Sequence, residues 1–432
     1  MLRSALALML LTTSAAAQDD LETAVKADYD AHLKDLFLHF HQNPELSFKE
    51  AKTAERLAKE LRQSGFEVTR EVGQTGVVAV MRNGEGPTVL VRADMDGLPV
   101  KEASGLDYAS QAEQEDIDGE VKPVMHACGH DVHITSLVGT ARQMAERKDD
   151  WSGTLVLIAQ PAEERIAGAR AMIKDGLYER FPKPDYALAF HVTSDLPAGR
   201  VTVPRENVAA SSDSVDIKVY GIGGHGASPH QAIDPVLVAS QIVVSLQSLV
   251  SRTIAPRDAG VVTVGSIHGG TKHNIIGEEV DLQLTVRSLD PEVREELLDG
   301  IDRIATGTAM AFGLPEDKHP KVARSAMETT PPTNNDPETA DKVRAAIESS
   351  LGGDVLIEEE ADGMGAEDFA YFVTPDTGVK GVYFSVGGAF PEDMEKPRPH
   401  HSPVFRVMPE PSVRTGTEAM VASAIALFEE GA

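Results

Sequence analysis

Acidic and histidine side chains recur in this sequence directly after short apolar runs that are expected to be buried strands. The runs cover residues 88–93, 154–159, 186–190 and 382–386. The polar residues that follow them are Asp94 and Asp96, Glu163 and Glu164, His191, and His400 and His401. In a parallel α/β sheet, ligands bind beyond the carboxyl ends of the strands. These side chains are therefore expected to meet at one edge of a sheet.

A second group of candidate ligands lies at the start of an expected helix that runs from about residue 133 to residue 144. The group consists of Cys128, His130, Asp131 and His133. The dipole of the helix favours a thiolate at its N-terminus. Thiolate, imidazole and carboxylate together are ligands of a transition metal such as Zn, Mn, Co or Ni, and not of Ca or Mg. Each residue alone is better explained as a helix cap or a hydrogen-bonded side chain, so the prediction of a metal site depends on their coincidence.

The adjacent acids Glu163 and Glu164 are expected to have different roles. Neighbouring side chains in an extended segment point in opposite directions, so the two carboxylates cannot bind one ion in the same manner. One can bind a metal while the other faces the substrate as a general base for hydrolysis. The alternative is a pair of acids on a solvated turn.

The pattern of helices and strands around these residues predicts two domains. Strands alternate with helices at both ends of the chain, which is typical of a doubly wound α/β domain with a mostly parallel sheet. In the middle, the strands 215–219 and 280–286 alternate apolar and polar residues, and Asp234-Pro235 and Asp290-Pro291 begin helices. We therefore expect an α+β domain over residues 210–326, inserted between residues 18–209 and 327–432 of the catalytic domain.

Composition and the N-terminus narrow the possible partners and the compartment. The 432 residues carry 40 Lys and Arg against 68 Asp and Glu, a formal charge of -28 that repels nucleic acid and anionic membranes. Residues 1–17 have the basic start, short apolar run and small residues of a signal peptide. The apolar run is too short to be a membrane anchor. Cleavage near Ala17 and export to the periplasm or medium are expected, and the single cysteine excludes an intramolecular disulfide.

Several motifs in the chain together resemble the metal-dependent aminoacylase and carboxypeptidase family, most nearly its branch of hippurate hydrolases and auxin amino-acid conjugate hydrolases. The matching segments are 92–99, Met125-His126-Ala127-Cys128-Gly129-His130-Asp131, Gln160-Pro161-Ala162-Glu163-Glu164, Gly365-Ala366-Glu367-Asp368-Phe369 and His401-Ser402-Pro403. They cover nearly all of the chain after the signal peptide, in the family's order. Gly97 in place of a common Ala, and the lack of a proline after Asn274, are the departures.

The resemblance implies a role for each candidate residue. Two divalent metal ions per subunit would be held by Cys128, His130, Glu164, His191 and His401, with Cys128 at a bridging position. Glu163 matches the general base, and Asp96 and Asp131 would support the ligands. The inserted domain would be a lid that forms a homodimer, through which His225 reaches the partner's active site to stabilise the oxyanion. Asn274 and Arg287 would contact the substrate.

The expected function is hydrolysis of the amide bond of N-acyl amino acids or small amino-acid conjugates, with a metal-bridged water activated by Glu163. A metallo-carboxypeptidase or dipeptidase that acts on short peptides shares the same metal core and is the main alternative. A non-catalytic metal-binding or ligand-binding protein is a weaker alternative, because the base and the ligands are both present. A serine hydrolase is disfavoured because the chain lacks a G-x-S-x-G elbow.

Overall fold

The computed structural model describes residues 21–358 and 363–429, so the expected signal peptide lies outside the described residues. The described chain forms two compact units. Unit 1 contains residues 21–208, 334–358 and 371–429, and unit 2 contains residues 209–333 and 363–370. Residues 363–370, which include the whole motif from Gly365 to Phe369, thus belong to unit 2 although they follow a segment of unit 1.

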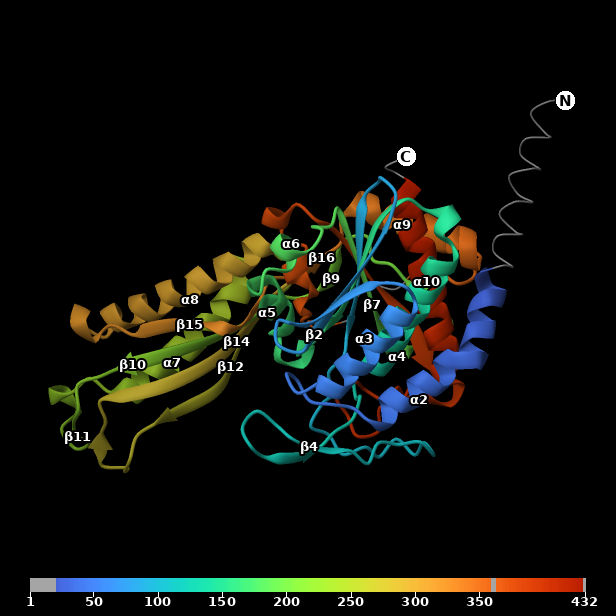
Figure 1. The fold of residues 1–432 in the computed structure, drawn as a ribbon. Helices are drawn as coiled ribbons and strands as arrows, with labels where there is room; N and C mark the ends of the chain where they lie inside the picture. Colours follow the sequence, from blue (N-terminus) through green and yellow to red (C-terminus); the bar gives the residue numbers. More distant parts are fainter. Residues whose placement is uncertain (1–20, 359–362, 430–432) are drawn as a thin grey trace. The chain divides into compact units, whose positions relative to one another are not determined.

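Unit 1 is built on a seven-stranded sheet (Figure 1). The strand order is β1 (Glu67–Val72), β2 (Gly76–Asn83), β6 (Gly153–Gln160), β3 (Thr88–Asp94), β7 (Tyr186–Pro197), β17 (Lys380–Ala389) and β8 (Val201–Thr202). The four strands β6, β3, β7 and β17 run parallel. The edge strands β1 and β8, and β2 beside β1, are paired antiparallel. The predicted α/β class with a mostly parallel sheet is confirmed.

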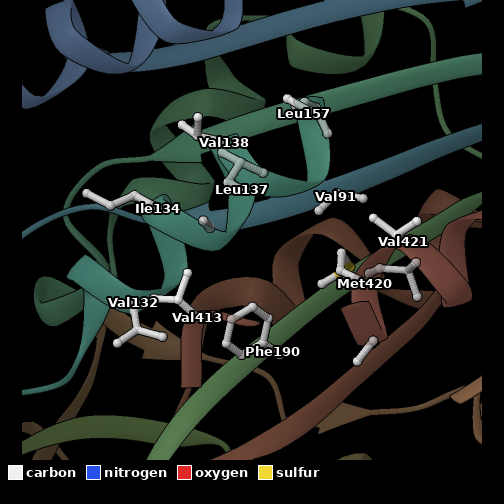
Figure 2. Packing of buried hydrophobic residues seen from close by; sticks show 14 of the residues in the cluster. Val91, Val132, Ile134, Leu137, Val138, Leu157, Phe190, Val413, Met420 and Val421 are labelled. Atoms are coloured by element: carbon white, nitrogen blue, oxygen red, sulfur yellow. The ribbon is translucent and has the colours of Figure 1, made fainter. Parts of the chain in front are cut away.

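Helices cover the sheet of unit 1 and bury it. These helices include α2 (Lys34–Gln42), α3 (Ala51–Gln63), α4 (His130–Glu146), α9 (Pro337–Leu351) and α10 (Pro409–Phe428). Figure 2 shows side chains of α4 and α10, such as Leu137 and Met420, packed around Val91 of β3 and Phe190 of β7. Leu90, the neighbour of Val91, points to the opposite face and is also buried. Burial on both faces explains why these strands are continuous apolar runs.

The start of α3 differs from the sequence pattern. Ser47 and Glu50 have the spacing of a capping box for a helix over residues 46–61. The helix instead begins at Ala51, and no side chain caps it. The Ser47 hydroxyl donates to Asp96 at 2.6 Å, and the Glu50 carboxylate accepts from the backbone N–H of Ala162 at 2.9 Å. The prediction of a capping box is therefore wrong, because the Ser47 and Glu50 side chains bind the loops that follow β3 and β6.

Unit 2 combines an antiparallel sheet with two long helices and has a hydrophobic core of its own. Its strands, in order, are β12 (Gly260–Gly269), β14 (Glu279–Ser288), β10 (Ser212–Tyr220) and β15 (Lys321–Thr330), and its helices are α7 (Pro235–Ser248) and α8 (Pro291–Ala311). The Asp234 and Asp290 side chains accept from backbone N–H groups in the first turns of these helices, as their Asp-Pro sequences predict.

One helical segment within the described residues is long and apolar enough to cross a membrane by length and composition, namely Pro235–Thr253. It consists of α7 and the π-helical turn that follows. Its inner residues, such as Ile242 and Leu246, lie in the core of unit 2. This inner face accounts for part of the helix's apolar character, and its outer face is considered below.

Candidate metal centre

The structure brings all five predicted metal ligands together in unit 1. The Sγ atom of Cys128 lies 3.3 Å from Nε2 of His191 and 3.3 Å from Nε2 of His401. Glu164 joins the group, because its Oε2 lies 3.4 Å from Nε2 of His401 and its Oε1 lies 3.8 Å from Nε2 of His130. His191 lies within β7, which continues past the predicted strand end. The cluster therefore gathers side chains from β7, the start of α4 and two loops.

The ligand atoms fall into overlapping groups in which all atoms lie within 4.8 Å of one another. One group contains Cys128, His130 and His191, and another contains Cys128, Glu164 and His401. Cys128 belongs to both groups. The arrangement suits two ions that share a sulfur ligand, which is the bridging position that the family resemblance implies for Cys128.

Two buried polar atoms in the cluster have no hydrogen-bond partner. They are Nε2 of His130 and Oε1 of Glu164. An unsatisfied buried polar group costs about 1–3 kcal/mol, and native proteins leave few of them. A cation between these two atoms would satisfy both, so the residues fit a bound metal ion.

Electrostatics at the cluster also favour a cation. Burial, together with the Glu164 carboxylate, raises the pKa of the Cys128 thiol well above its usual range. Burial raises the pKa of Glu164 to about 8, although His130 opposes the shift. Burial and the neighbouring acids thus outweigh the helix dipole that was expected to keep Cys128 ionised. A divalent ion would reverse both shifts, because metals bind the deprotonated forms of these groups.

Hydrogen bonds orient two of the histidine rings toward the cluster. Nδ1 of His130 donates to the backbone oxygen of Asp96 at 2.9 Å, and Nδ1 of His191 donates to the backbone oxygen of Val192 at 2.7 Å. With Nδ1 protonated, Nε2 of each neutral ring carries the lone pair that a metal requires. The backbone therefore selects the tautomer that can bind an ion.

The two acids predicted to support the ligands have different partners. The Asp96 carboxylate accepts from the backbone N–H of Glu163 at 3.1 Å and of Glu164 at 3.2 Å, as well as from Ser47. Asp96 thus holds the turn that carries both glutamates. Asp131 instead pairs with Nδ1 of His41 at 2.7 Å and accepts from the Val132 N–H. Its carboxylate fixes the start of α4 to α2.

Glu163 and Glu164 lie on a short 3-10 turn, Glu163–Arg165, and not in an extended segment. The two side chains therefore do not alternate as they would in an extended strand, and the extended backbone expected from the sequence is wrong. One carboxylate oxygen from each acid lies within 4.8 Å of the other and of a ring nitrogen of His130. The turn is flanked by Ala162 and Ile166, which have φ angles of 49° and 50°. Such left-handed conformations cost roughly 1–2 kcal/mol per non-glycine residue, and this strain is typical of active sites.

Gly129 allows Cys128 and His130 to approach the sheet. Its φ of +85° is left-handed, and a Cβ at this position would lie 2.3 Å from Cγ1 of Val192 on β7. Only glycine satisfies both the backbone angle and the close contact. The residue between the two ligands is thus set by the packing of α4 against β7.

The structure adds three residues for which no role was assigned from sequence, although their positions were noticed. Nδ1 of His400 lies 3.7 Å from Sγ of Cys128. Oδ2 of Asp94 lies 3.7 Å from Nε2 of His130, and its other oxygen accepts from His133 at 2.6 Å. Nε2 of His133 accepts from the backbone N–H of Val192 at 2.9 Å. Asp94 and His133 thus connect β3, α4 and β7 beneath the cluster.

The predicted residues of unit 2 lie at two ends of its sheet. His225 and Asn274 are neighbours, because β11 (Gly224–His225) pairs with β13 (Ile275–Ile276), and both lie near the Glu279 end of β14. Arg287 lies near the other end of β14 and donates to the backbone oxygen of Met364 at 2.6 Å. Eight residues of strand separate the two ends by roughly 27 Å. One copy of unit 2 therefore does not bring His225 and Arg287 to the same small substrate.

Comparison with known proteins identifies the class of this chain. Peptidase family M20/M25/M40 matches residues 90–425. Hippurate hydrolase of Campylobacter jejuni is 38% identical over 336 residues, which are 77% of this chain and 82% of that protein. Thermostable carboxypeptidase 2 of Saccharolobus solfataricus is 38% identical over 351 residues, 80% of this chain and 83% of that protein.

A solved structure is similar over most of the chain. It is a dinuclear metal-binding peptidase of the M20 family from Bacillus subtilis, which matches with a TM-score of 0.77 and 26% identity and covers 93% of this chain and 99% of that one. The chain belongs to peptidase family M20/M25/M40. It is accordingly a metal-dependent hydrolase, and the predicted resemblance is confirmed.

Proposed function

We propose that this hydrolase cleaves the amide bond of N-acyl amino acids, with Glu163 as its general base. The observation that carries the proposal is the buried cluster of Cys128, His130 and Glu164, in which two unpartnered atoms adjoin the Glu163 carboxylate. Hippurate, the substrate in the name of one relative, is itself an N-acyl amino acid. The family and the geometry of the cluster therefore support the same reaction.

The ligand set for the metal pair would be Cys128, His130, Glu164, His191 and His401. When bound, two divalent ions supply positive charge that polarises a carbonyl and makes a water more acidic. Glu163 would take a proton from the attacking water while a C–O bond forms at the amide carbon. It would then deliver this proton to the nitrogen as the C–N bond breaks, which releases the amino acid.

A carboxypeptidase activity is the second candidate, and the similarity to thermostable carboxypeptidase 2 favours it. The two reactions break the same kind of bond and differ in the group on the acyl side. A panel of N-acetyl, N-benzoyl and indoleacetyl amino acids beside dipeptides and tripeptides separates them. A kcat/KM for peptides above that for acyl amino acids would favour the second candidate.

Substitution of Glu163 by Gln tests the proposal. Glu163→Gln keeps the shape of the side chain and removes its basicity, so kcat should fall by roughly 10²- to 10⁴-fold while bound metal is unchanged. Glu55→Gln, at an exposed position of α3 in the same unit, is the matched control and should keep full activity. Substantial turnover by Glu163→Gln would show that another group is the base, and metal-loaded wild-type protein that cleaves no acyl amino acid would refute the function.

We also propose that the protein is a homodimer formed through unit 2. The outer face of α7 exposes Leu237 and Val244, and no charged residue lies between Asp234 and Arg252. β12, which contacts α7, is an edge strand of the sheet. A large exposed apolar face is typical of an interface. A partner's copy of unit 2 would also supply a second His225, since one copy of unit 2 does not bring its own His225 and Arg287 to the same small substrate.

The oligomeric state can be measured by sedimentation. Val244→Glu should convert the dimer to a monomer, because it places a charge in the interface. Met327→Glu is the control, since Met327 is 71% exposed on β15 at the opposite edge of the same sheet. A wild-type monomer, or equal effects of both variants, would contradict the proposed interface.

Which metal the centre binds, and whether the protein is exported, are two further parts of the proposal. Zn, Mn, Co and Ni all suit a set of one sulfur, three imidazoles and a carboxylate, so activity is to be compared after loading with each. Export after cleavage near Ala17 is tested by the N-terminal sequence of the protein recovered from cells that express the full chain. A mature chain that begins at Met1 would refute export by this signal.

A further inference from the structure

A cavity of about 240 Å³ lies in unit 1 beside the metal centre. Glu164 forms part of its wall, so the cavity adjoins the acids proposed for catalysis. The apolar residues Leu46, Leu98, Pro99 and Ile117 also line it, together with Gly97, the polar Ser47 and Asp116, and Arg165. Its volume is just below the range of roughly 300–1,000 Å³ found for sites of drug-sized ligands. The cavity therefore has room for one small chemical group of a ligand.

A β-hairpin forms one wall of this cavity. The hairpin consists of β4 (Glu113–Glu115), β5 (Val121–Pro123) and the turn between them, which carries Ile117. The Gln114 side chain accepts from the backbone N–H of Leu46 at 2.6 Å and donates to the backbone oxygen of Lys49 at 3.1 Å. The turn is closed by Asp116, whose carboxylate accepts from the N–H groups of Asp118 and Glu120. The wall is therefore held in place before any ligand binds.

The charge around the cavity disfavours an anionic ligand. The hairpin segment 113–123 contains five acids and one lysine. Arg165 is a possible partner for an anion, but its guanidinium faces Asp118 at 3.9 Å and Asp116 lies in the same wall. Away from the proposed metal ions, a second carboxylate carried on the acyl group would meet more negative than positive charge at short range. A neutral apolar group would instead cover the apolar surface of Leu98 and Ile117.

We propose that this cavity binds the acyl side of the substrate and selects a neutral, apolar acyl group of about the size of one aromatic ring. The proposal rests on the proposed function, since it places the scissile carbonyl next to Glu163 and Glu164 and its acyl substituent against Ile117. Ile117 is then a specificity-determining residue, and Gln114 is the positioning residue that holds its hairpin.

Gly97 lines the same cavity without limiting its size. A Cβ at Gly97 would lie 3.1 Å from Cγ1 of Val124 and 3.2 Å from the backbone oxygen of Met125. It would point into the packing behind the wall and away from open space. The presence of glycine, where the family commonly has alanine, therefore does not enlarge the acyl site.

The test compares N-acetyl, N-benzoyl and N-succinyl derivatives of one amino acid. Wild-type kcat/KM should be highest for the benzoyl and lowest for the succinyl derivative. Ile117→Ala should lower kcat/KM for the benzoyl derivative about tenfold, with little change for the acetyl derivative, because shape changes in an apolar pocket typically cost tenfold or more. Gln114→Ala should act in the same direction by loosening the hairpin. Val121→Ala, which is exposed on the same hairpin outside the cavity, should change neither.

A binding measurement separates failure of this inference from failure of the proposed function. Benzoate binding to metal-loaded Glu163→Gln protein is measured by calorimetry with and without Ile117→Ala, and a roughly tenfold weaker affinity in the double variant supports the acyl site without any turnover. If acyl amino acids are cleaved but Ile117→Ala leaves both the benzoyl preference and benzoate binding unchanged, the acyl site is refuted and the function stands. Preference for the succinyl derivative would also refute it, in favour of an anion bound by Arg165.

Discussion

The clearest quantitative prediction concerns His41, a buried histidine on α2. Both of its ring nitrogens face carboxylates, Nδ1 at 2.7 Å from Asp131 and Nε2 at 3.2 Å from Glu102. Ionised carboxylates only accept hydrogen bonds, so the ring must be doubly protonated to donate to both. Burial alone would lower the pKa of His41, but the hydrogen bonds to Asp131 and Glu102 raise it to about 9.

The raised pKa makes the free energy of unfolding depend on pH. Because the folded value lies above the unfolded value of about 6.5, the stabilisation is complete below pH 6.5 and is lost as the pH rises through about 9. A pKa of about 9 in the folded state against about 6.5 in the unfolded state corresponds to about 3 kcal/mol. His41→Gln should therefore destabilise the protein by about 3 kcal/mol more at pH 6 than at pH 10.

Urea denaturation, monitored by tryptophan fluorescence, measures the unfolding of unit 1, which contains His41. Trp151 is the single tryptophan, and it is buried in unit 1 against Phe428. His39→Gln is the matched control on the same helix: partial burial together with Arg56 lowers the pKa of His39, so this substitution should not destabilise the protein more at pH 6 than at pH 10. An equal destabilisation of His41→Gln at pH 6 and pH 10 would show that His41 is neutral in the folded protein and would refute the reasoning.

Two further predictions concern the metal centre. Gly129→Ala should lower the stability of unit 1 by about 2–5 kcal/mol, because of the left-handed backbone and the clash with Val192. Gly105 has a similar φ but open space around it, so Gly105→Ala should cost only about 1–2 kcal/mol. Urea denaturation of both variants measures the two costs, and equal costs would contradict the clash. Cys128→Ser should reduce the bound metal from two ions to one or none, because its sulfur belongs to both ligand groups, whereas His400→Asn should keep both ions. Elemental analysis after dialysis measures the bound metal of each variant. Two tightly held ions in Cys128→Ser would contradict the shared sulfur.

Local patterns predicted much of this fold. The parallel strands are continuous apolar runs, and the Asp-Pro pairs at 234 and 290 mark helix starts, because the side chain caps the first turn whatever the tertiary context. The grouping of the expected ligands could also be predicted, because side chains that follow parallel strands lie at the same edge of the sheet.

Other features depend on contacts between distant segments and have no local pattern. The left-handed Ala162 and Ile166 give no signal in the sequence, because neither residue favours a positive φ. Ser47 has the spacing of a helix cap, yet its hydroxyl binds Asp96, which is 49 positions away. The hairpin at residues 113–123 is too polar and too short to be recognised as a cavity wall. Each of these features is set by packing that only the folded chain reveals.

The separation of the two hydrophobic cores bears on how such proteins diversify. All five expected ligands and the proposed general base are encoded in segments that fold into unit 1, and among the described residues the core of unit 2 shares no residue with that of unit 1. Mutations that alter the second core are thus relieved of the constraint of preserving ligand geometry.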